Sequence, residues 1–359
     1  PPAPAGGGGR RRSGPPVRHP GCAAMLPGIP VPPPTNPSSS SVMNRNLHFI
    51  LGDGVIGCAT AGELARRGIP YVLASRTPPN GPAAGAHRQV DALDRDALLA
   101  ASAGATHLYP TLGLPYSTRV WERDWPRVIE NAIAAARTHG LRLVMFDNIY
   151  GYGPAPLRQP IDEDHPQEPP SRKGRVRKAV DDRLLWAARE DGVPVLLARA
   201  SDFYGPGVRN VVIFAAAIER QLQRKAAFWL GDPDSLHSYT YVPDAARGMV
   251  ELALDEGAYG QAWHLPTMSP APTSRALLEM SARLLDAPQR VRVQPAAVQA
   301  VLGLFVPILR ELREIRYQHT QDFVFSSARF SQRYPDFRIT SYEEGMKAMV
   351  HSLRREQPL

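Results

Sequence analysis

The fold is decided by one stretch, HFILGDGVIGCATAGELARRGIPYVLASR (His48–Arg76). Its apolar run Phe49–Leu51 predicts a buried parallel strand, and a Gly-x-Gly-x-x-Gly turn leads from it into an Ala-rich segment of helical character that reaches Arg67. Gly68 then predicts the end of the helix, and Tyr71–Ala74 predicts a second strand. A glycine turn placed between a strand and a helix in this way is typical of a site that binds the pyrophosphate of a dinucleotide.

Each glycine of this turn has its own predicted role. Gly52 permits the tight turn, Gly54 lets the backbone approach a pyrophosphate, and Gly57 lets the helix pack closely on the strand. The free N–H groups at the helix start, around Val55 and Ile56, then face the phosphates. The alternative is a tight turn with a purely structural role.

The end of the second strand bears on which nicotinamide cofactor binds. A site for NAD usually places Asp or Glu about 20 residues after the glycines, where it bonds the ribose 2′-hydroxyl. Residues 74–78 read Ala-Ser-Arg-Thr-Pro and offer no carboxylate. Arg76 can instead hold a 2′-phosphate, with Ser75 or Thr77 adding a hydroxyl, so the sequence favours NADP(H), with NAD(H) as the alternative. In the plainer interpretation, Arg76 is a solvated turn residue.

Composition limits the possible partners. The chain of 359 residues is 43% hydrophobic, enough for one large α/β domain or two smaller ones. Half of its formal net charge of +8 comes from four arginines among residues 1–42, which contain no Asp or Glu. The remainder is mildly basic and has no basic-aromatic stripe, so nucleic-acid binding is not expected.

Residues 1–42 are expected to be a disordered tail, because they hold 12 of the 37 prolines and a four-glycine run. They show no long apolar segment of a secretory signal, and Met43 offers an alternative start of the protein. Cys22 and Cys58 form neither a disulfide framework nor a metal-ligand spacing. We therefore expect a cytoplasmic protein without a metal site.

Strands and helices alternate along most of the chain. Further strands are expected at 89–94, 106–110, 141–146 and 194–198, and helices at 94–103, 121–139 and 178–189. This alternation predicts the α/β class, with a Rossmann-type, doubly wound parallel sheet.

The chain is expected to divide into two parts. Residues 43–204 would form the NAD(P)-binding domain, and residues 205–359 mainly a smaller, substrate-capping lobe that can return a strand to the sheet. The apolar run Val298–Leu309 is shorter than a bilayer span and contains Gly303 and Pro307, so we expect a core or interface helix rather than a membrane anchor.

Other positions near strand ends are expected to line the cofactor crevice. Asp91 and Leu93 are placed where an adenine ring would lie, and Pro110 ends a strand in a loop over the crevice. The polar and aromatic loop Asp147–Pro154 follows another strand, at the edge where open sheets bind ligands.

Three further segments carry a family resemblance. RASDFYGPG (Arg199–Gly207) is similar to an R-x-x-N-V-Y-G-P strand end, GDPDSLHSYTYVPDAAR (Gly231–Arg247) to a segment ending in Y-V-D-D-V-A, and Asp147–Pro154 to an S-S-x-x-V-Y-G-x-P loop. From Met43 onward, the chain resembles an extended short-chain dehydrogenase/reductase of the NAD-dependent epimerase/dehydratase type. The resemblance implies the fold, the cofactor crevice and a homodimer paired through two helices that flank the sheet.

The catalytic positions of that family are not matched. Its Y-G-x-S-K motif supplies a Tyr general acid/base and a Lys that holds the ribose and lowers the Tyr pKa. Aligning the glycine places Lys173 at the Tyr position and Arg177 at the Lys position, with Asp181 at the following acidic position. Asp147 replaces the first Ser of the loop. The chain thus resembles an atypical branch of the family without the usual catalytic residues.

Two residues are candidates for proton transfer. Lys173 can act as a base near neutral pH only where burial or neighbouring cations lower the pKa of a lysine, and Arg172, Arg175 and Arg177 are near it in sequence. Asp147 can accept a substrate proton, or pair with Lys173 or Arg177 instead. The plain alternatives are a solvated lysine and a turn-forming aspartate. Arg177 is expected to replace the ribose-holding lysine.

Aromatic and polar loop residues are expected to contact an organic, partly apolar small molecule. His237 is a further candidate for catalysis because the pKa of a histidine lies near neutrality, but the sequence shows no partner to orient it, so a substrate hydrogen bond or a structural role is expected. The expected substrate contacts are Tyr116, Trp121, Tyr152, Asp202, Phe203, His237 and Tyr239.

Three functions remain open at this point. The first is an NADP(H)-dependent oxidoreductase that acts on a carbonyl or a secondary alcohol. The second is a sugar-nucleotide epimerase or dehydratase, which the missing Tyr–Lys pair disfavours. The third is a nucleotide-binding sensor or accessory protein without turnover, which the same absence favours.

Overall fold

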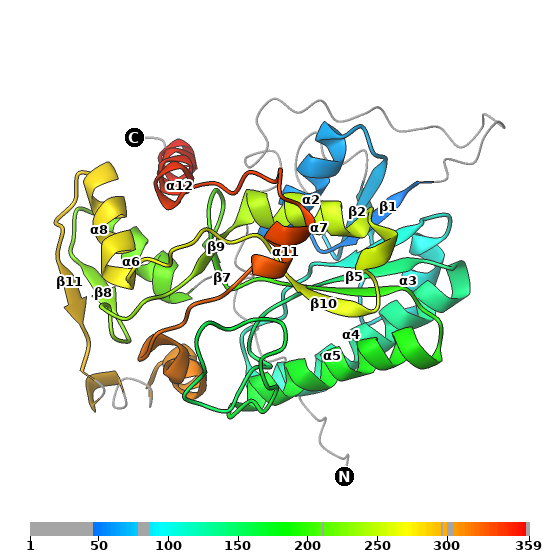
Figure 1. Cartoon of the computed structure of the whole chain (residues 1–359), viewed down its shortest axis with the longest axis horizontal. Coiled ribbons are helices and arrows are strands. Elements are labelled where there is room, and N and C mark those ends of the chain that lie inside the picture. Colours follow the sequence, from blue (N-terminus) through cyan, green and yellow to red (C-terminus); the bar gives the residue numbers. More distant parts are fainter. Residues whose placement is uncertain (1–45, 78–86, 210–211, 296, 300–304, 357–359) are drawn as a thin grey trace, which may run out of the picture.

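The computed structural model describes residues 46–77, 87–209, 212–295, 297–299 and 305–356. Seven parallel strands form its central sheet, in the order β3-β2-β1-β4-β5-β6-β10 (Figure 1). Their bounds are β1 His48–Leu51, β2 Tyr71–Ser75, β3 His87–Gln89, β4 His107–Pro110, β5 Arg142–Asp147, β6 Val195–Arg199 and β10 Gln261–His264. The strand order reverses between β1 and β4, and ligands bind beside such a reversal in open sheets.

Helices cover both faces of this sheet (Figure 1). Helices α3, α4 and α5 pack on one face, and α2 and α7 pack on the other. Their bounds are α2 Val55–Arg66, α3 Arg95–Ser102, α4 Thr118–His139, α5 Arg172–Glu190 and α7 Val242–Ala253. The predicted doubly wound α/β fold is confirmed.

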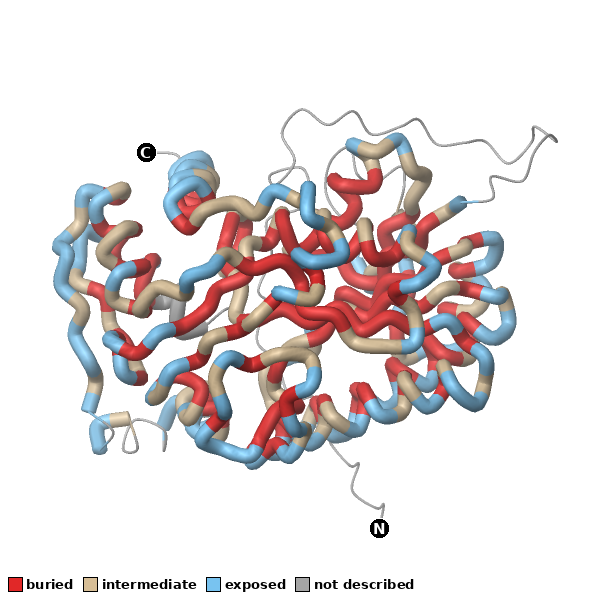
Figure 2. Tube along the Cα trace, viewed as in Figure 1, coloured by how far each residue is buried: buried red, intermediate tan, exposed pale blue. Residues whose placement is uncertain are grey.

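The central strands are buried on both faces, which is why they read as continuous apolar runs. Successive side chains of a strand point to opposite faces. Ile50 and Leu73 therefore join the core under α2 and α7, whereas Phe49 and Leu51 join the core under α3, α4 and α5. Figure 2 shows the sheet as the most continuously buried part of the molecule.

Three elements differ from the sequence predictions. Helix α5 begins at Arg172 rather than at residue 178, because Ser171 caps its first turn by accepting a hydrogen bond from the Gly174 N–H at 3.0 Å. Helix α4 begins three residues earlier than predicted, at Thr118. Strand β3 lies at 87–89 rather than at 89–94, since the chain turns there and the Asp94 N–H bonds the carbonyl oxygen of residue 91.

A smaller group of elements lies beyond the carboxyl edge of the sheet (Figure 1). The strand pair β7–β9 leads into it, the pair β8–β11 lies at its far side, and β10 returns the chain to the sheet beside β6. The remaining bounds are β7 Asp202–Tyr204, α6 Val212–Leu222, β8 Ala227–Trp229, β9 Tyr239–Tyr241, η2 Glu256–Ala258, α8 Ser274–Leu284, β11 Val291–Val293, α10 Pro307–Leu312, η3 Arg313–His319, α11 Ala328–Arg333 and α12 Tyr342–Glu356.

Some predictions fall outside the residues that the structure describes. These include the whole tail at 1–42 and much of the apolar run at 298–309. Within the described ranges, no helix is both long enough and apolar enough to cross a bilayer.

Candidate active site

The glycine turn between β1 and α2 brings three segments into close contact. Gly52 has a φ of +126°, and a Cβ built on it would lie 2.6 Å from backbone atoms of Leu112, so another residue would be strained and would clash. A Cβ on Gly57 would lie 1.9 Å from the Gly52 carbonyl oxygen, so α2 packs directly on the turn. In contrast, none of the residues that the structure describes lies within 4 Å of a Cβ built on Gly54.

The start of α2 leaves backbone donors for a ligand. Gly54 is its N-cap and has no side chain to accept from the first turn, and no acidic residue occupies that turn, which includes Val55 and Ile56. The first N–H groups of a helix have no partner within the helix, and its N-terminus carries partial positive charge. Together with the open position at Gly54, this backbone fits the diphosphate of a dinucleotide.

The end of β2 holds a carboxylate that sequence analysis missed. The Ser75 hydroxyl lies 3.0 Å from Oδ2 of Asp53, 2.9 Å from Nε2 of His87 and 2.8 Å from the Thr77 carbonyl oxygen. Asp53 belongs to the glycine turn itself, rather than following it by the usual 20 residues, so the motif gave no signal for it. Arg76 is exposed beside this cluster. A negative charge here favours ribose hydroxyls, whereas the guanidinium favours a phosphate.

The other predicted cofactor residues flank the same edge. Pro110 ends β4 in register with Leu51, so it lies beside the glycine turn. Asp91 is exposed, and its Oδ1 accepts a hydrogen bond from the Leu93 N–H at 3.0 Å, which shapes the turn before α3.

Asp147 lies in a fully buried cluster of charges. Its Oδ1 accepts from the Arg177 guanidinium, with Nε at 3.0 Å, and its Oδ2 accepts from Arg199 Nε at 3.0 Å. Arg199 also donates to Asp181 at 2.7 Å and to the Tyr152 hydroxyl at 2.9 Å. Burial alone would raise the pKa of Asp147, but the two guanidiniums hold it below its usual range. Burial and the Asp147 carboxylate raise the pKa of Asp181.

This cluster resolves one of the alternatives that the sequence left open. Asp147 pairs with Arg177, whose guanidinium also lies over the Trp125 ring, 4.5 Å from its centroid. A buried ion pair of this kind holds strand ends together and is costly to break. The Asp147 carboxylate accepts from two guanidiniums, so Asp147 and Arg177 have structural partners in the places where the sequence suggested catalytic ones.

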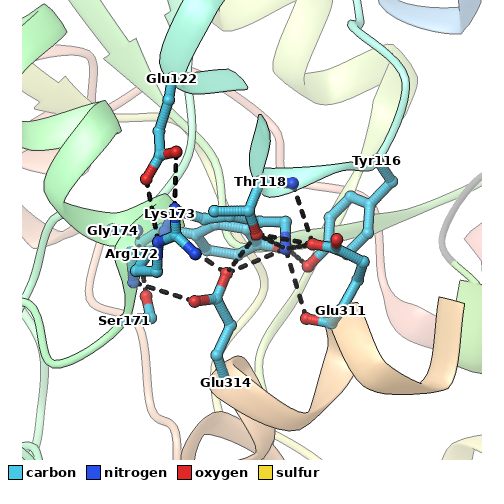
Figure 3. Close-up of polar contacts among 10 residues, drawn as sticks. Tyr116, Thr118, Glu122, Ser171, Arg172, Lys173, Gly174, Glu311 and Glu314 are labelled. Atoms are coloured by element: carbon cyan, nitrogen blue, oxygen red, sulfur yellow. Dashed lines mark hydrogen bonds and ion pairs between the residues drawn. The ribbon is translucent and has the colours of Figure 1, made fainter. Parts of the chain in front are cut away.

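Lys173 is fully buried at the start of α5 (Figure 3). Its Nζ donates to Thr118 Oγ1 at 2.9 Å, to Glu314 Oε1 at 2.9 Å and to the Glu311 carboxylate, and it lies 4.6 Å from the Tyr116 ring centroid. The Glu311 carbonyl oxygen, 3.3 Å away, is a fourth acceptor, so the three N–H donors of the ammonium group all have partners. Burial alone would raise the pKa of Glu311, but hydrogen bonds from Lys173 and Thr118 lower it.

The prediction that cationic side chains surround Lys173 is wrong. The Arg172 guanidinium bonds Glu122, with its Nη2 2.7 Å from Oε2 (Figure 3). Arg175 donates to the Pro170 carbonyl oxygen. Carboxylates from α10 and η3 take their place. Glu311 and Glu314 are about 140 residues from Lys173 along the chain, so local sequence gave no signal for them.

Tyr116 joins Lys173 to a second tyrosine. The hydroxyls of Tyr116 and Tyr150 lie 3.4 Å apart, and Tyr150 stacks on Trp121 with ring centroids 6.0 Å apart. Burial raises the pKa of both tyrosines, with the Asp202 carboxylate adding to the effect. Tyr116 and Trp121, two of the expected substrate contacts, thus pack with Tyr150, a neighbour that sequence analysis did not name.

Asp202, His237 and His319 form a cluster near these tyrosines. His237 Nε2 lies 3.1 Å from Asp202 Oδ2, and His319 Nε2 lies 3.9 Å from the same oxygen. Burial lowers the pKa of His319 to about 4. Burial alone would raise the pKa of Asp202, but the hydrogen bond from His237 and the nearby His319 lower it. The sequence showed no orienting partner for His237, and the structure places Asp202, 35 residues earlier in the chain, in that position.

The other expected substrate residues have protein partners. The Tyr152 hydroxyl lies 2.6 Å from His264 Nε2 and also accepts from Arg199, inside the core. The Tyr239 hydroxyl lies 2.8 Å from Ser274 Oγ. Phe203 is half-buried, and its ring packs edge-on against Phe146.

Comparison with known proteins gives a family match over most of the fold. The sequence model of the NAD dependent epimerase/dehydratase family matches residues 49–264. The chain is 24% identical over 130 residues, 35% of its length, to the Bacillus subtilis protein "Uncharacterized UDP-glucose epimerase YtcB". It is 28% identical over 153 residues, 40% of its length, to Arabidopsis thaliana 3beta-hydroxysteroid-dehydrogenase/decarboxylase isoform 2. These matches span 40% and 25% of the two relatives, respectively.

Solved structures share the fold over nearly their whole length. UDP-glucose 4-epimerase of Thermotoga maritima, solved with UDP-glucose, has a TM-score of 0.71 at 17% identity, over 86% of this chain and 99% of that one. UDP-glucuronic acid 4-epimerase of Bacillus cereus, solved with NAD, has a TM-score of 0.68 at 15% identity, over 86% of this chain and 99% of that one. RMD of Pseudomonas aeruginosa, solved with NADPH, has a TM-score of 0.63 at 18% identity, over 86% of this chain and 99% of that one.

Proposed function

The chain belongs to the NAD dependent epimerase/dehydratase family, and from that membership we propose that it binds a nicotinamide dinucleotide and acts as an oxidoreductase on a carbonyl or secondary alcohol of a small molecule. The observation that carries this proposal is the turn between β1 and α2. Its one open glycine, Gly54, and the uncapped first turn of α2 form a backbone cradle for a diphosphate. Solved relatives of the same fold hold NAD or NADPH.

The chain's own residues have distinct parts in this proposal. The backbone at Gly54 and the start of α2 would hold the diphosphate, and Ser75, Asp53 and Arg76 would contact the ribose end. When bound, the nicotinamide supplies or accepts a hydride. The residues beyond the sheet edge would orient the substrate and exclude water.

Lys173 is the group we assign to proton transfer. It stands at the position of the missing Tyr, on the rigid first turn of α5, and Thr118 and Tyr116 lie beside its amine. An ammonium group can give a proton to a forming alkoxide, and the amine can take one back. Asp147 and Arg177 then serve to hold the strand and helix that carry this group.

Two observations favour alternative functions. The carboxylates of Glu311 and Glu314 form ion pairs with the amine of Lys173, and an amine held in this way suits a binding protein without turnover. The structural relatives named as epimerases make a sugar nucleotide the first substrate class to test. The lack of the Tyr–Lys pair argues against the usual epimerase chemistry.

A titration and a turnover assay test the proposal. Tryptophan fluorescence should show saturable binding of NADPH and NADH, with NADPH the tighter if Arg76 dominates at the ribose end. The parent protein should oxidise NADPH with a member of a carbonyl panel, and Lys173→Met should lose this turnover while still binding the cofactor. Binding without turnover by the parent would favour the sensor, and absence of binding would overturn the proposal.

A further inference from the structure

Asp202, His237 and His319 converge from three separate segments. Asp202 begins β7, His237 lies in the loop before β9, and His319 ends η3. Strands β7 and β9 pair in parallel with Asp202 opposite Tyr239, which brings His237 beside Asp202. One ligand atom from each of the three residues lies within 4.8 Å of the others.

The negative charge of Asp202 in this cluster has no Lys or Arg partner among the described residues. Its partners are the two histidines. His237 and His319 are 2% and 7% exposed at the side chain, and Nδ1 of His319 is buried without a hydrogen-bond partner among the described residues. A partly buried carboxylate without a Lys or Arg partner and a buried ring nitrogen without a hydrogen bond both carry an energetic cost. A bound cation would relieve both.

We propose that Asp202, His237 and His319 bind one divalent transition-metal ion, with Zn²⁺ the best match to the donor set. Two imidazole nitrogens and one carboxylate oxygen are ligands that Zn²⁺ takes readily in proteins. The separations of 3.1 Å and 3.9 Å from the Asp202 oxygen to the two rings are close to those between neighbouring ligands about 2.1 Å from one ion.

One movement is needed for all three to reach the same ion. The rings of His237 and His319 are stacked, 5.1 Å apart and 13° from parallel, and ligand lone pairs lie in the ring planes. Rotation of the His319 ring about its Cβ–Cγ bond would turn it toward Asp202. This rotation breaks no hydrogen bond of Nδ1, which has none.

The site would keep coordination positions open. Asp202 is the most exposed of the three residues, with 19% of its side chain accessible. The charge of Asp202 acts on the hydroxyls of Tyr116, an expected substrate contact, and of Tyr150, so the cluster lies near both tyrosines. Three protein ligands with an open position are typical of a metal that also binds water or a substrate oxygen. The proposal does not depend on cofactor binding at the glycine turn.

Direct metal binding tests the proposal without any enzymatic assay. The chain is treated with a chelator and dialysed, and ZnCl₂ is then titrated by isothermal calorimetry, with metal content measured after gel filtration. The parent should bind one equivalent, and Zn²⁺ should raise its melting temperature. Asp202→Asn and His319→Ala should each weaken binding at least tenfold, which is the usual scale for loss of one ligand.

Matched controls separate this site from other histidines. His351→Ala removes an exposed histidine of α12, and His19→Ala removes one from the residues that the structure does not describe. Both should bind Zn²⁺ like the parent. Asp202→Asn preserves the shape of the side chain, so its circular dichroism spectrum should match that of the parent. No stoichiometric binding, or equal binding by parent and Asp202→Asn, would overturn the proposal and leave an Asp–His hydrogen-bonded pair.

Discussion

At the residue scale, the partners of each buried charged side chain indicate whether it has a structural role. Asp147 and Lys173 were both candidates for proton transfer, yet Asp147 is closed in by Arg177 and Arg199. Lys173 is also buried and paired, but its carboxylate partners come from α10 and η3. The sequence alone could place both residues at strand and helix ends, but their partners come from distant segments.

Asp53 is expected to oppose a 2′-phosphate. Asp53→Asn removes the charge next to Ser75 while keeping the side chain's shape, so the affinity for NADPH relative to NADH should rise about tenfold, on the order of 1 kcal/mol for one charge near the surface. Fluorescence titration with both cofactors measures this ratio. Arg76→Gln should shift the ratio in the other direction. An unchanged ratio in both variants would show that neither side chain contacts the ribose.

The buried charge cluster should be important for stability. Asp147→Asn leaves two buried guanidiniums with one carboxylate fewer, and breaking such a pair costs roughly 3–5 kcal/mol. Urea unfolding followed by circular dichroism gives the free energy of unfolding. Lys347→Ala removes an exposed pair with Glu343 and should change it by less than about 0.5 kcal/mol. A loss for Asp147→Asn no larger than this control would contradict the structural role.

At the element scale, the sequence predicted what local patterns determine. The apolar runs at 49–51 and 141–146 and the glycine turn lie where they were expected, because buried strands and tight turns depend on neighbouring residues. The start of α5 was missed, since its first turn is rich in arginine and lacks an apolar periodicity. Its start depends on Ser171, one residue before the helix.

The Ser171 cap is expected to stabilise α5. Ser171→Ala leaves the Gly174 N–H without its acceptor and should lower the free energy of unfolding by about 1 kcal/mol or more. Ser117 is a matched control, because it precedes α4 without a side-chain cap hydrogen bond. Chemical unfolding of both variants measures the difference. Equal effects of the two substitutions would show that Ser171 does not act as a cap.

At the scale of the whole molecule, the site depends on contacts between distant parts of the chain. Glu311, Glu314 and His319 reach β7 and α5 from the C-terminal part, and β10 returns to the sheet after α7. No pattern around Lys173 or Asp202 could have predicted these neighbours, because the fold brings them together across 100 residues or more. Family resemblance predicted the sheet, but it could not predict these partners.

Buried histidines should make the folded protein sensitive to acid. Burial lowers the pKa of His48 and His264 to about 3 and of His107 to about 4, below the ordinary 6.5. At a pH between the folded-state and unfolded-state pKa values, each of these histidines is protonated in the unfolded chain but not in the folded one. The stability that the neutral buried rings contribute is therefore complete above about pH 7 and is lost as the pH falls. From pH 7 to pH 5 the loss should be roughly 2 kcal/mol for each histidine.

Urea unfolding at pH 7, 6 and 5 checks this dependence. The free energy of unfolding should fall more steeply with decreasing pH than it does in a domain without such buried histidines. His264→Gln should have a shallower slope than the parent, whereas the exposed His351→Gln should have the same slope. A free energy of unfolding that stays constant down to pH 5 would contradict the buried, neutral state of these rings.

The central claim is that the backbone at Gly54 holds a dinucleotide diphosphate, and one variant tests it most directly. Gly54 has an extended backbone conformation with φ −71°, and a Cβ there meets no atom of the described part of the chain, so Gly54→Val should fold with the stability of the parent. Its side chain would occupy the space of the ligand. Calorimetric titration should therefore show NADPH and NADH binding by the parent and at least a hundredfold weaker binding by Gly54→Val. Equal binding by both proteins would contradict the account.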